Sequence, residues 1–321
     1  MVERGQIAPA DRAHLAGWLA RRFTTGQDTQ FALEGCTGWP YVAEELAAAG
    51  ITAHVGEPAE TAAARGPKKR AKTDKADSRH LRQLLADGRL PECWIPPSHV
   101  LECRALLELY HDLRTGHTAW VQRIHAVLFH QGARQLSDGL RSQDGLAVLR
   151  HIAETQLTGA GQLQVATALD VLGALEAHLD TVRRRLLDTA AHLTGARVLT
   201  ARLYGAGPIT ALALTCWLGG KDRFSSARKA VRFAGLDVTV YSSAGKRSPG
   251  HLSRQGPAVL RWCVYEAGKA HARASAPDHA YYAQVKDRID GKRAAISEAR
   301  KIIRQACHIL SEPGDDALAT S

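Results

Sequence analysis

The pattern of apolar and polar positions predicts an α/β layer near the start of the chain. Residues 11–22 carry apolar side chains at helical spacing after Asp11, a residue type that caps helix N-termini. Residues 29–33 and 51–55 are short apolar runs that predict strands, and residues 41–49 predict a helix between them. Because a strand, a helix and a second strand follow one another, we expect the two strands to pair in parallel.

Longer stretches further on have apolar residues at every third or fourth position. Residues 98–132 predict one long helix, and residues 162–194 predict a second whose apolar seam is typical of a coiled coil. Residues 135–161 between them are rich in Gly and Gln, and we expect a hinge there. Residues 256–310 predict further helices, interrupted at Pro277. The fold class is therefore α/β followed by a mostly α region.

A glycine-bearing turn is expected between two short helices around residues 203–211. Gly205 and Gly207 flank Ala206, and the second helix should begin near Pro208. Glycines at this place allow the backbone N–H groups of the second helix to point at a phosphate. The form matches a helix-hairpin-helix, which holds a nucleic-acid backbone without reading its sequence. A plain helical turn is the alternative.

The charge balance favours a polyanionic partner. The 321 residues include 42 Lys and Arg against 32 Asp and Glu, a formal net charge of +10. We expect nucleic acid rather than a membrane, because no apolar stretch approaches the roughly 18 residues of a spanning helix. The N-terminus has no signal-peptide pattern, so the expected location is the cytoplasm. The six cysteines lie far apart and without zinc-site spacing.

A strongly basic segment with two embedded acids precedes one of the predicted helices. Asp74 and Asp77 are three residues apart, so both carboxylates fall on one face of the first helical turn. One hypothesis is a divalent-metal site that receives phosphate. The other is that the acids cap the helix and pair with Lys72, Lys75 or Arg79, and the sequence favours neither. The neighbouring candidates for nucleic-acid contact are Lys68, Lys69, Arg70 and Lys72.

Residues 242–256 combine hydroxyls, glycines and cations with almost no apolar side chains, so they predict a loop or an edge turn. From spacing alone, a solvated loop that holds a nucleic-acid backbone is favoured. The alternative is a serine nucleophile, since a serine that attacks a phosphodiester needs cations where charge develops. The cations available for either role are Lys246, Arg247, Arg254 and Arg261.

Three blocks of sequence together resemble the DEDD-type insertion-sequence transposases, whose best-known members are bridge-RNA-guided recombinases. The first block is Leu-Glu-Gly-Cys-Thr-Gly at 33–38 and the second is Lys-Thr-Asp-Lys-Ala-Asp at 72–77. The third block runs from Gly205 to Arg261. Its matching positions are Gly205–Pro208, Phe224, Ala234–Leu236, Ser243, Gly250, Gly256 and Leu260–Arg261.

The resemblance implies three domains. An incomplete RuvC-like (RNase H-like) domain would cover residues 1–97, a coiled-coil insertion 98–194, and a mainly helical C-terminal transposase domain 195–321. It also implies DNA and a structured guide RNA as partners, and a homodimer or tetramer formed through the coiled coil.

The resemblance further implies a set of site residues. Glu34, Asp74 and Asp77 correspond to the second, third and fourth Mg²⁺-binding acids of the family. Ser243 corresponds to the serine that attacks the scissile phosphate and forms a covalent protein–DNA intermediate. Two departures stand out: the strand with Gly-x-Asp that opens the family pattern is missing, and Ala244 replaces the usual glycine. We therefore expect an N-terminally truncated chain.

Three functions follow from these expectations. The first is a DNA transposase or recombinase that breaks and rejoins strands through Ser243. The second is a catalytically inactive remnant that only binds nucleic acid. The third is a metal-dependent junction nuclease without covalent chemistry.

Overall fold

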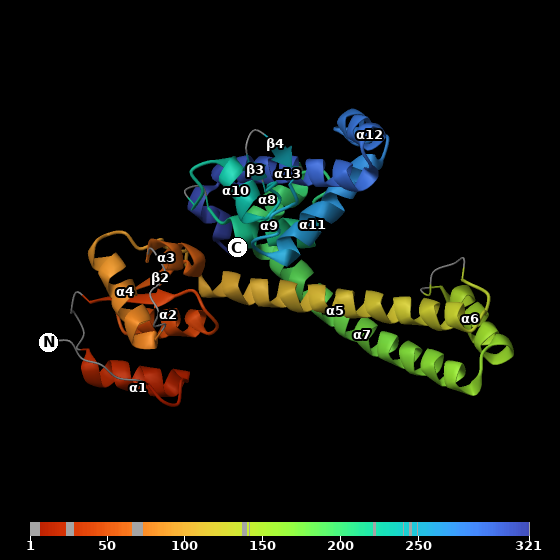
Figure 1. The fold of residues 1–321 in the computed structure, drawn as a ribbon, viewed down its shortest axis with the longest axis horizontal. Coiled ribbons are helices and arrows are strands. Elements are labelled where there is room, and N and C mark those ends of the chain that lie inside the picture. Colours follow the sequence, from red (N-terminus) through yellow and green to blue (C-terminus); the bar gives the residue numbers. More distant parts are fainter. Residues whose placement is uncertain are drawn as a thin grey trace. The chain divides into compact units, whose positions relative to one another are not determined.

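The computed structural model describes the chain as two compact units, Met1–Ser98 and His99–Ser321, both mostly helical (Figure 1). The fold-class prediction is correct in outline, because a small parallel sheet in the first unit precedes a helical second unit. The described residues are 7–23, 29–65, 73–136, 140, 142–220, 223–239, 241–243, 246–248 and 250–320, with only the backbone described for 241–243 and 246–248.

A two-stranded parallel sheet forms the centre of the first unit. Strand β1 (Gln30–Glu34) pairs with β2 (Thr52–Gly56), and α2 (Trp39–Ala48) connects them, as the sequence predicts. The last pair in the register is Glu34 with Gly56. The apolar core beside the sheet contains Leu15, Leu19, Leu46 and Ile51.

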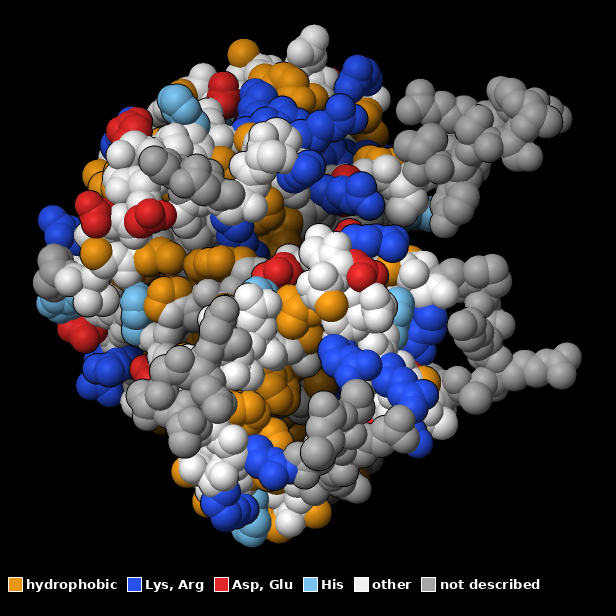
Figure 2. Space-filling model, turned by 90° about the vertical axis from the view of Figure 1, so that its left-hand side faces the viewer, with side chains coloured by type: hydrophobic (Ala, Val, Ile, Leu, Met, Phe, Trp, Pro, Cys, Tyr) orange, Lys and Arg blue, Asp and Glu red, His pale blue; other side chains and the backbone are white. Residues whose placement is uncertain are grey.

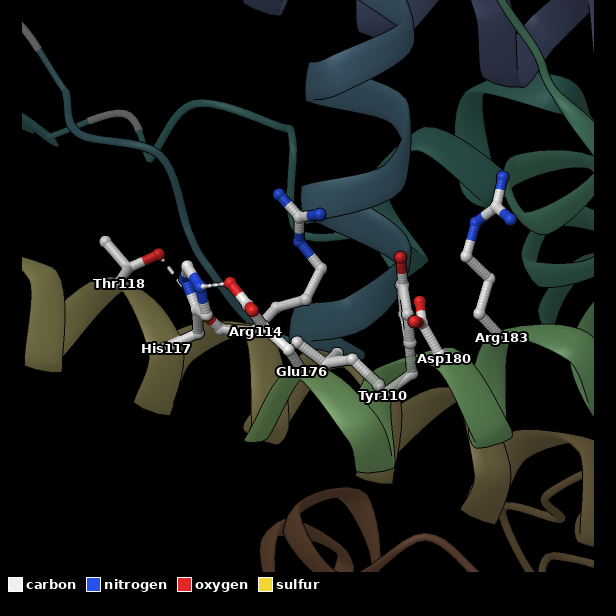
Figure 3. A pocket seen from close by; sticks show the side chains of 8 residues that line it. Tyr110, Arg114, His117, Thr118, Glu176, Asp180 and Arg183 are labelled. Atoms are coloured by element: carbon white, nitrogen blue, oxygen red, sulfur yellow. Dashed lines mark hydrogen bonds and ion pairs between the residues drawn. The ribbon is translucent and has the colours of Figure 1, made fainter. Parts of the chain in front are cut away.

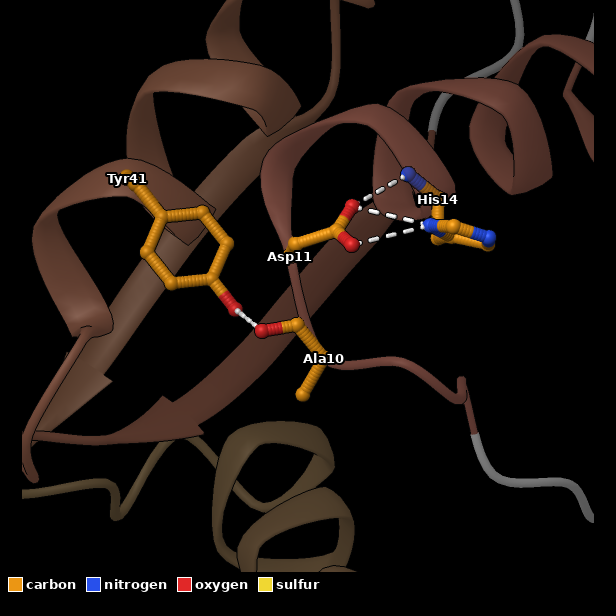
Figure 4. A network of polar contacts seen from close by, with 4 residues as sticks. All are labelled: Ala10, Asp11, His14 and Tyr41. Atoms are coloured by element: carbon orange, nitrogen blue, oxygen red, sulfur yellow. Dashed lines mark hydrogen bonds and ion pairs between the residues drawn. The ribbon is translucent and has the colours of Figure 1, made fainter.

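Helix α1 (Arg12–Arg22) is fixed at its N-terminal end by polar contacts (Figure 4). A carboxylate oxygen of the capping Asp11 accepts a hydrogen bond from the backbone N–H of His14 at 2.9 Å. The hydroxyl of Tyr41 in α2 donates to the carbonyl oxygen of Ala10 at 3.4 Å. The contact of Tyr41 joins the start of α1 to the β1–α2–β2 motif.

Two further helices complete the first unit. Helix α3 (Pro58–Ala64) follows β2, and α4 (Asp74–Ala86) packs against β1. Thr73 is the N-cap of α4, since its Oγ1 accepts from the backbone N–H of Ala76 at 3.2 Å. The N-cap is therefore Thr73 and neither Asp74 nor Asp77.

The second unit begins with a helical arm. Helices α5 (Ser98–His130) and α7 (Gly159–His192) confirm the two long predicted helices and extend away from the helical body (Figure 1). The hinge prediction for residues 135–161 is wrong in part, because α6 (Gln143–Gln156) forms there. Leu149 and Ile152 of α6 are buried against α5 and α7, and this burial stabilises a helix in a Gly- and Gln-rich segment.

A bundle of shorter helices forms the body of the second unit. Helix α9 is buried from Ala211 to Leu218, which agrees with its apolar sequence on all sides. The interruption predicted at Pro277 is confirmed, since Pro277 lies between η2 and α12. The helices in chain order are α8 (Thr194–Arg202), α9 (Pro208–Leu218), α10 (Ala227–Phe233), α11 (Ala258–Lys269), η2 (Ala270–Ala272), α12 (His279–Arg288), α13 (Gly291–Ser311) and η3 (Gly314–Leu318).

Helix α13 packs against α8, α10, α11 and α12. Among the described residues, none of the helices combines the length and the apolar composition that a membrane span requires.

Candidate nucleic-acid interface

A β-hairpin carries the serine that the sequence singles out. Strand β3 (Tyr241–Ser243) pairs antiparallel with β4 (Lys246–Ser248), where the sequence predicts a loop or an edge turn. Ser243 pairs with Lys246, the last pair before Ala244 and Gly245, which lie outside the described residues. Ser243, Lys246 and Arg247 are therefore placed by their backbone alone, at the tip of this hairpin.

The two chain segments that lead into the hairpin are joined by backbone hydrogen bonds. The N–H of Thr239 donates to the carbonyl of His251 at 2.9 Å, and the N–H of Ser253 donates to that of Asp237 at 3.0 Å. The N–H of Arg254 donates to the carbonyl of Gly235 at 3.1 Å. The hairpin consequently projects from a paired base rather than from a free loop.

Glycines at this base allow backbone segments to approach more closely than a side chain permits. A Cβ on Gly235, whose φ is +68°, would lie 2.0 Å from the carbonyl oxygen of Gln255. A Cβ on Gly250 would lie 1.4 Å from that of Thr239. Gly256 has the same constraint. These three glycines of the third sequence block thus have a physical reason, since each fills a position where any side chain would collide.

Arg261 holds the carbonyl groups of the hairpin base. Its Nη1 donates to the carbonyl of Gly256 at 2.7 Å and to that of Gln255 at 3.2 Å. Burial, followed by the nearby charge of Arg254, lowers the pKa of Arg261. These contacts give Arg261 a positioning role for the hairpin. Its predicted contact with nucleic acid stays a prediction.

A groove of about 730 Å³ lies beside the hairpin base and is lined by arginines. Arg254, a candidate from the sequence, lines the groove together with Arg288 of α12 and Arg293 of α13. Arg300 also lines the groove, and its Nε donates to the carbonyl of Leu236 at 2.8 Å. Val238 and Ile289 add exposed apolar surface. Cations beside apolar side chains suit the phosphates and bases of nucleic acid.

Sequence reasoning did not assign three of these arginines. Arg288, Arg293 and Arg300 are far from Arg254 along the chain, and only the packing of α12 and α13 against the hairpin base brings them together. The sequence signal for these three arginines is the high density of Arg and Lys from residue 288 onward.

The predicted glycine turn connects α8 and α9, and both helices are confirmed. Gly205 has a φ of +81°, and a Cβ there would lie 2.8 Å from the carbonyl oxygen of Ala267 in α11. Gly207 is the N-cap of α9, and no atom lies within 4 Å of the position that a Cβ on this residue would occupy. A pocket of about 620 Å³ lies over this turn and is also lined by Arg202 and Arg273. The open side at Gly207 leaves space for a phosphate at the start of α9.

In the first unit, the three predicted metal ligands lie on two elements. Glu34 ends β1, Asp74 is exposed at the start of α4, and Asp77 lies one turn further along. An oxygen of Asp77 lies 2.6 Å from Nη1 of Arg65, a cation that sequence reasoning did not consider as its partner. Among the described residues, one group of three potential metal ligands has all its ligand atoms within 4.8 Å, and it does not include these acids. The three carboxylates therefore do not form a ready metal site.

The other cations predicted to contact nucleic acid in this unit are Lys68, Lys69, Arg70 and Lys72, which lie outside the described residues. On the face drawn in Figure 2, Lys and Arg side chains gather in patches, while Asp and Glu side chains are scattered. The uneven distribution of charge agrees with a polyanionic partner.

A pocket of about 310 Å³ between α5 and α7 differs from the arginine groove (Figure 3). Arg114 and Arg183 line it, but so do the acids Glu176 and Asp180. Nε2 of His117 lies 3.1 Å from Oε1 of Glu176. Because acids balance the cations, this pocket suits phosphate poorly.

Comparison with known proteins agrees with these features. The family model for the "Transposase IS116/IS110/IS902 family" matches residues 198–283, which run from α8 into α12 and include the glycine turn and the hairpin. A "Probable family 20 transposase" of Pseudomonas aeruginosa PAO1 is 24% identical over 255 residues, covering 76% of this chain and 72% of the relative.

By class, these similarities point to the transposases of insertion sequences. More particularly, residues 198–283 are similar to the IS116/IS110/IS902 family, in agreement with the resemblance predicted from the sequence motifs.

Proposed function

We propose that this chain is a transposase that breaks and rejoins DNA strands with Ser243 as its nucleophile. The observation that supports this role is the position of Ser243 at the tip of a hairpin whose base is fixed by backbone contacts and borders the arginine groove. The residues matched by the transposase family contain this whole hairpin. A rigid base is what an attacking hydroxyl needs, since misplacement by about 1 Å slows a reaction strongly.

The chemistry is a transfer of a phosphodiester between two hydroxyls. Oγ of Ser243 loses its proton and attacks the scissile phosphorus, so that an Oγ–P bond forms while a P–O bond of the DNA breaks. The released DNA oxygen takes up a proton. Rejoining is the reverse reaction with a different DNA hydroxyl, which expels Ser243. Lys246 and Arg247, which follow it in β4, would stabilise the negative charge that develops on the phosphate.

DNA binding would extend from the hairpin along the second unit. Arg254 and the arginines of the groove would hold phosphates, and the turn at Gly205 and Gly207 would hold a backbone at the start of α9. We further propose that a structured guide RNA takes part. The arm of α5 and α7 would join the chain to further copies as a homodimer or tetramer.

We further propose that Glu34, Asp74 and Asp77 bind Mg²⁺. As they lie, these residues fit the ion poorly, because the carboxylates do not converge and Asp77 is paired with Arg65. Magnesium binding would require Arg65 to release Asp77. No step of the phosphodiester transfer proposed above depends on this ion.

Trapping of the covalent intermediate tests the proposal. Wild-type chain incubated with labelled element-end DNA and its RNA should yield a protein–DNA adduct that resists denaturant. Ser243→Ala should lower the adduct by about three orders of magnitude or more, the usual loss for a nucleophile. Ser242→Ala, one residue away in the same strand, is the matched control and should retain adduct formation.

The arginine groove by itself supports a second candidate, a chain that binds nucleic acid without catalysis, because holding phosphates requires only these cations. In that case wild type and Ser243→Ala would both bind DNA and both fail to form an adduct. A metal-dependent nuclease, the third possibility, would instead retain cleavage in Ser243→Ala and lose it in Asp77→Asn.

A further inference from the structure

A buried group of potential metal ligands lies in the second unit, apart from the proposed catalytic residues. His271 belongs to η2, Asp278 is the N-cap residue of α12, and Glu298 belongs to α13. One nitrogen or oxygen of each lies within 4.8 Å of the others. The side chains of His271 and Glu298 are 3% and 0% exposed, whereas that of Asp278 is 34% exposed.

The polar atoms of this group are not satisfied by hydrogen bonds. Both ring nitrogens of His271 and Oε2 of Glu298 are buried and have no hydrogen-bond partner among the described residues. Nδ1 of His271 lies 3.8 Å from Oε2 of Glu298, which is too long for a hydrogen bond. Buried polar groups without partners are rare in folded proteins because each costs stability, so a missing ligand is a direct explanation.

The neighbouring charges limit which ligand could bind between His271, Asp278 and Glu298. Nζ of Lys301 lies 3.5 Å from Oε1 of Glu298 and 3.7 Å from Oδ1 of Asp278. The same Nζ lies 3.5 Å from the ring centroid of Tyr281, so this ammonium has a second partner besides the carboxylates. On the other side, the ring of Tyr204 meets His271 edge-on at 5.1 Å and offers no charge.

We propose that His271, Asp278 and Glu298 bind a divalent transition-metal cation, for which Zn²⁺ is the best fit. One imidazole nitrogen with carboxylate oxygens is a ligand set that zinc accepts, whereas Mg²⁺ prefers oxygen alone. In a tetrahedral zinc site with bonds of about 2.0–2.1 Å, neighbouring ligand atoms lie roughly 3.4 Å apart. The separation of 3.8 Å between Nδ1 and Oε2 is close to this spacing.

The proposed site joins three elements of the second unit. The bound cation would fix η2 and the start of α12 to α13. Since α12 carries Arg288 into the arginine groove, the metal would act on the shape of the nucleic-acid interface and not on the chemistry at Ser243.

Lys301 is the natural competitor of the cation. Its ammonium lies near two of the three ligands, and its removal leaves their negative charge uncompensated. Lys301→Met should therefore bind Zn²⁺ more tightly than wild type. This expectation separates a metal site from a merely structural cluster, in which loss of Lys301 would create no affinity for zinc.

The test is calorimetric titration of the full chain with Zn²⁺, after removal of metals with a chelator and in excess Mg²⁺. Magnesium occupies oxygen-only sites, so binding at Glu34, Asp74 and Asp77 does not interfere. Wild type should bind one equivalent, Asp278→Asn and Glu298→Gln should each weaken binding roughly tenfold or more, and Lys301→Met should strengthen it about tenfold. Asp287→Asn, an exposed acid in the same helix with the same change of charge, should leave the affinity unchanged.

The outcomes separate cleanly. Absence of zinc binding in both wild type and Lys301→Met would overturn the proposal. Zinc binding with unchanged affinity in Asp278→Asn would also overturn it, because an ion bound elsewhere, for example at the exposed Cys36, does not depend on Asp278. Asp278 is partly exposed, so its variant keeps the test valid even if Glu298→Gln fails to fold. No DNA is required, so the result is independent of the role proposed for Ser243.

Discussion

Two sets of three potential metal ligands lie in the two units, and they differ in how they are held. Glu34, Asp74 and Asp77 of the first unit are recognisable in the sequence but do not converge. His271, Asp278 and Glu298 of the second unit have no recognisable sequence spacing, yet their ligand atoms lie together. Local sequence can identify the ligand types of a metal site, whereas packing decides whether those ligands meet.

The surrounding helices explain the difference. Helix α4, which carries Asp74 and Asp77, has a single fully buried residue, Leu84. Helix α13, which carries Glu298, buries apolar residues along its length and packs against α8, α9, α10, α11 and α12. A side chain on α13 is therefore held in place by the core. The acids of α4 lie near the surface, where an ion pair such as the one with Arg65 determines their position.

The largest effect that we predict comes from substituting two glycines with positive φ, one in each unit. The two substitutions test the difference in packing. Gly235→Ala in the second unit should lower the free energy of unfolding by about 3–5 kcal/mol, because a Cβ would lie 2.0 Å from a backbone oxygen. Gly50→Ala in the first unit has a similar φ of +72° but no atom within 4 Å of its Cβ, and should cost about 1–2 kcal/mol. Urea titration with hydrogen exchange in α10 and α2 measures each unit separately.

Equal losses in the two variants would contradict the contrast. They would mean that the left-handed backbone conformation, which both glycines share, accounts for the whole cost and that the close approach at Gly235 relaxes freely.

The sequence predicted the elements of this fold better than their tertiary contacts. The parallel strands, the long helices and the turn at Gly205 follow from periodicity and from glycine and proline positions, which act over a few residues. Helix α6 was missed because its stability comes from the burial of Leu149 and Ile152 against distant helices. A Gly- and Gln-rich composition does not reveal such burial.

The candidate site divides in the same way. Arg254 was predicted from its own loop, but Arg288 and Arg293 enter the groove only through the packing of α12 and α13. The sequence shows no sign that Arg65 pairs with Asp77, since the two are separated by residues 66–76. Partners that are brought together by the fold cannot be read from spacing alone.

The next prediction sharpens the contrast between the two ligand sets. Arg65→Met should raise the affinity of the first unit for Mg²⁺ about three- to tenfold, because Asp77 loses its cation and becomes available to a metal. Mn²⁺, which is paramagnetic, can replace Mg²⁺ so that binding is followed by electron paramagnetic resonance. Arg82→Met removes the same charge from an exposed position of α4 and serves as the control. If both variants bind the ion equally, net charge rather than release of Asp77 controls the site.

A smaller effect tests whether the arginine groove is part of the DNA-binding surface. Arg288 is exposed in the groove, so Arg288→Gln should weaken DNA binding a few-fold and reduce the slope of log affinity against log salt by about 0.9. Arg184→Gln, an exposed position of α7 with the same change of charge, should have a slope close to that of wild type. Binding titrations at several salt concentrations measure both. Identical slopes in the two variants would remove the groove from the interface.

The smallest effect concerns an exposed ion pair of the second unit, where packing contributes nothing. The guanidinium of Arg202 donates to both carboxylate oxygens of Glu312, and this contact lowers the pKa of Glu312. Because the folded-state pKa lies below the ordinary 4.5, the stabilisation is present above about pH 4.5 and is lost as the pH falls through the folded-state value.

Glu312→Gln should accordingly lower Tm by about 1–2 °C or less at pH 6, and the difference from wild type should shrink as the pH falls below 4.5. Thermal unfolding at low salt measures this difference, since salt screens exposed pairs. Arg202 also lines the pocket over the glycine turn, so its release should leave DNA binding unchanged or stronger. Weaker DNA binding in Glu312→Gln would instead show that the ion pair positions Arg202 for phosphate. An exposed ion pair would then fix the position of a functional side chain, as packing does in the core.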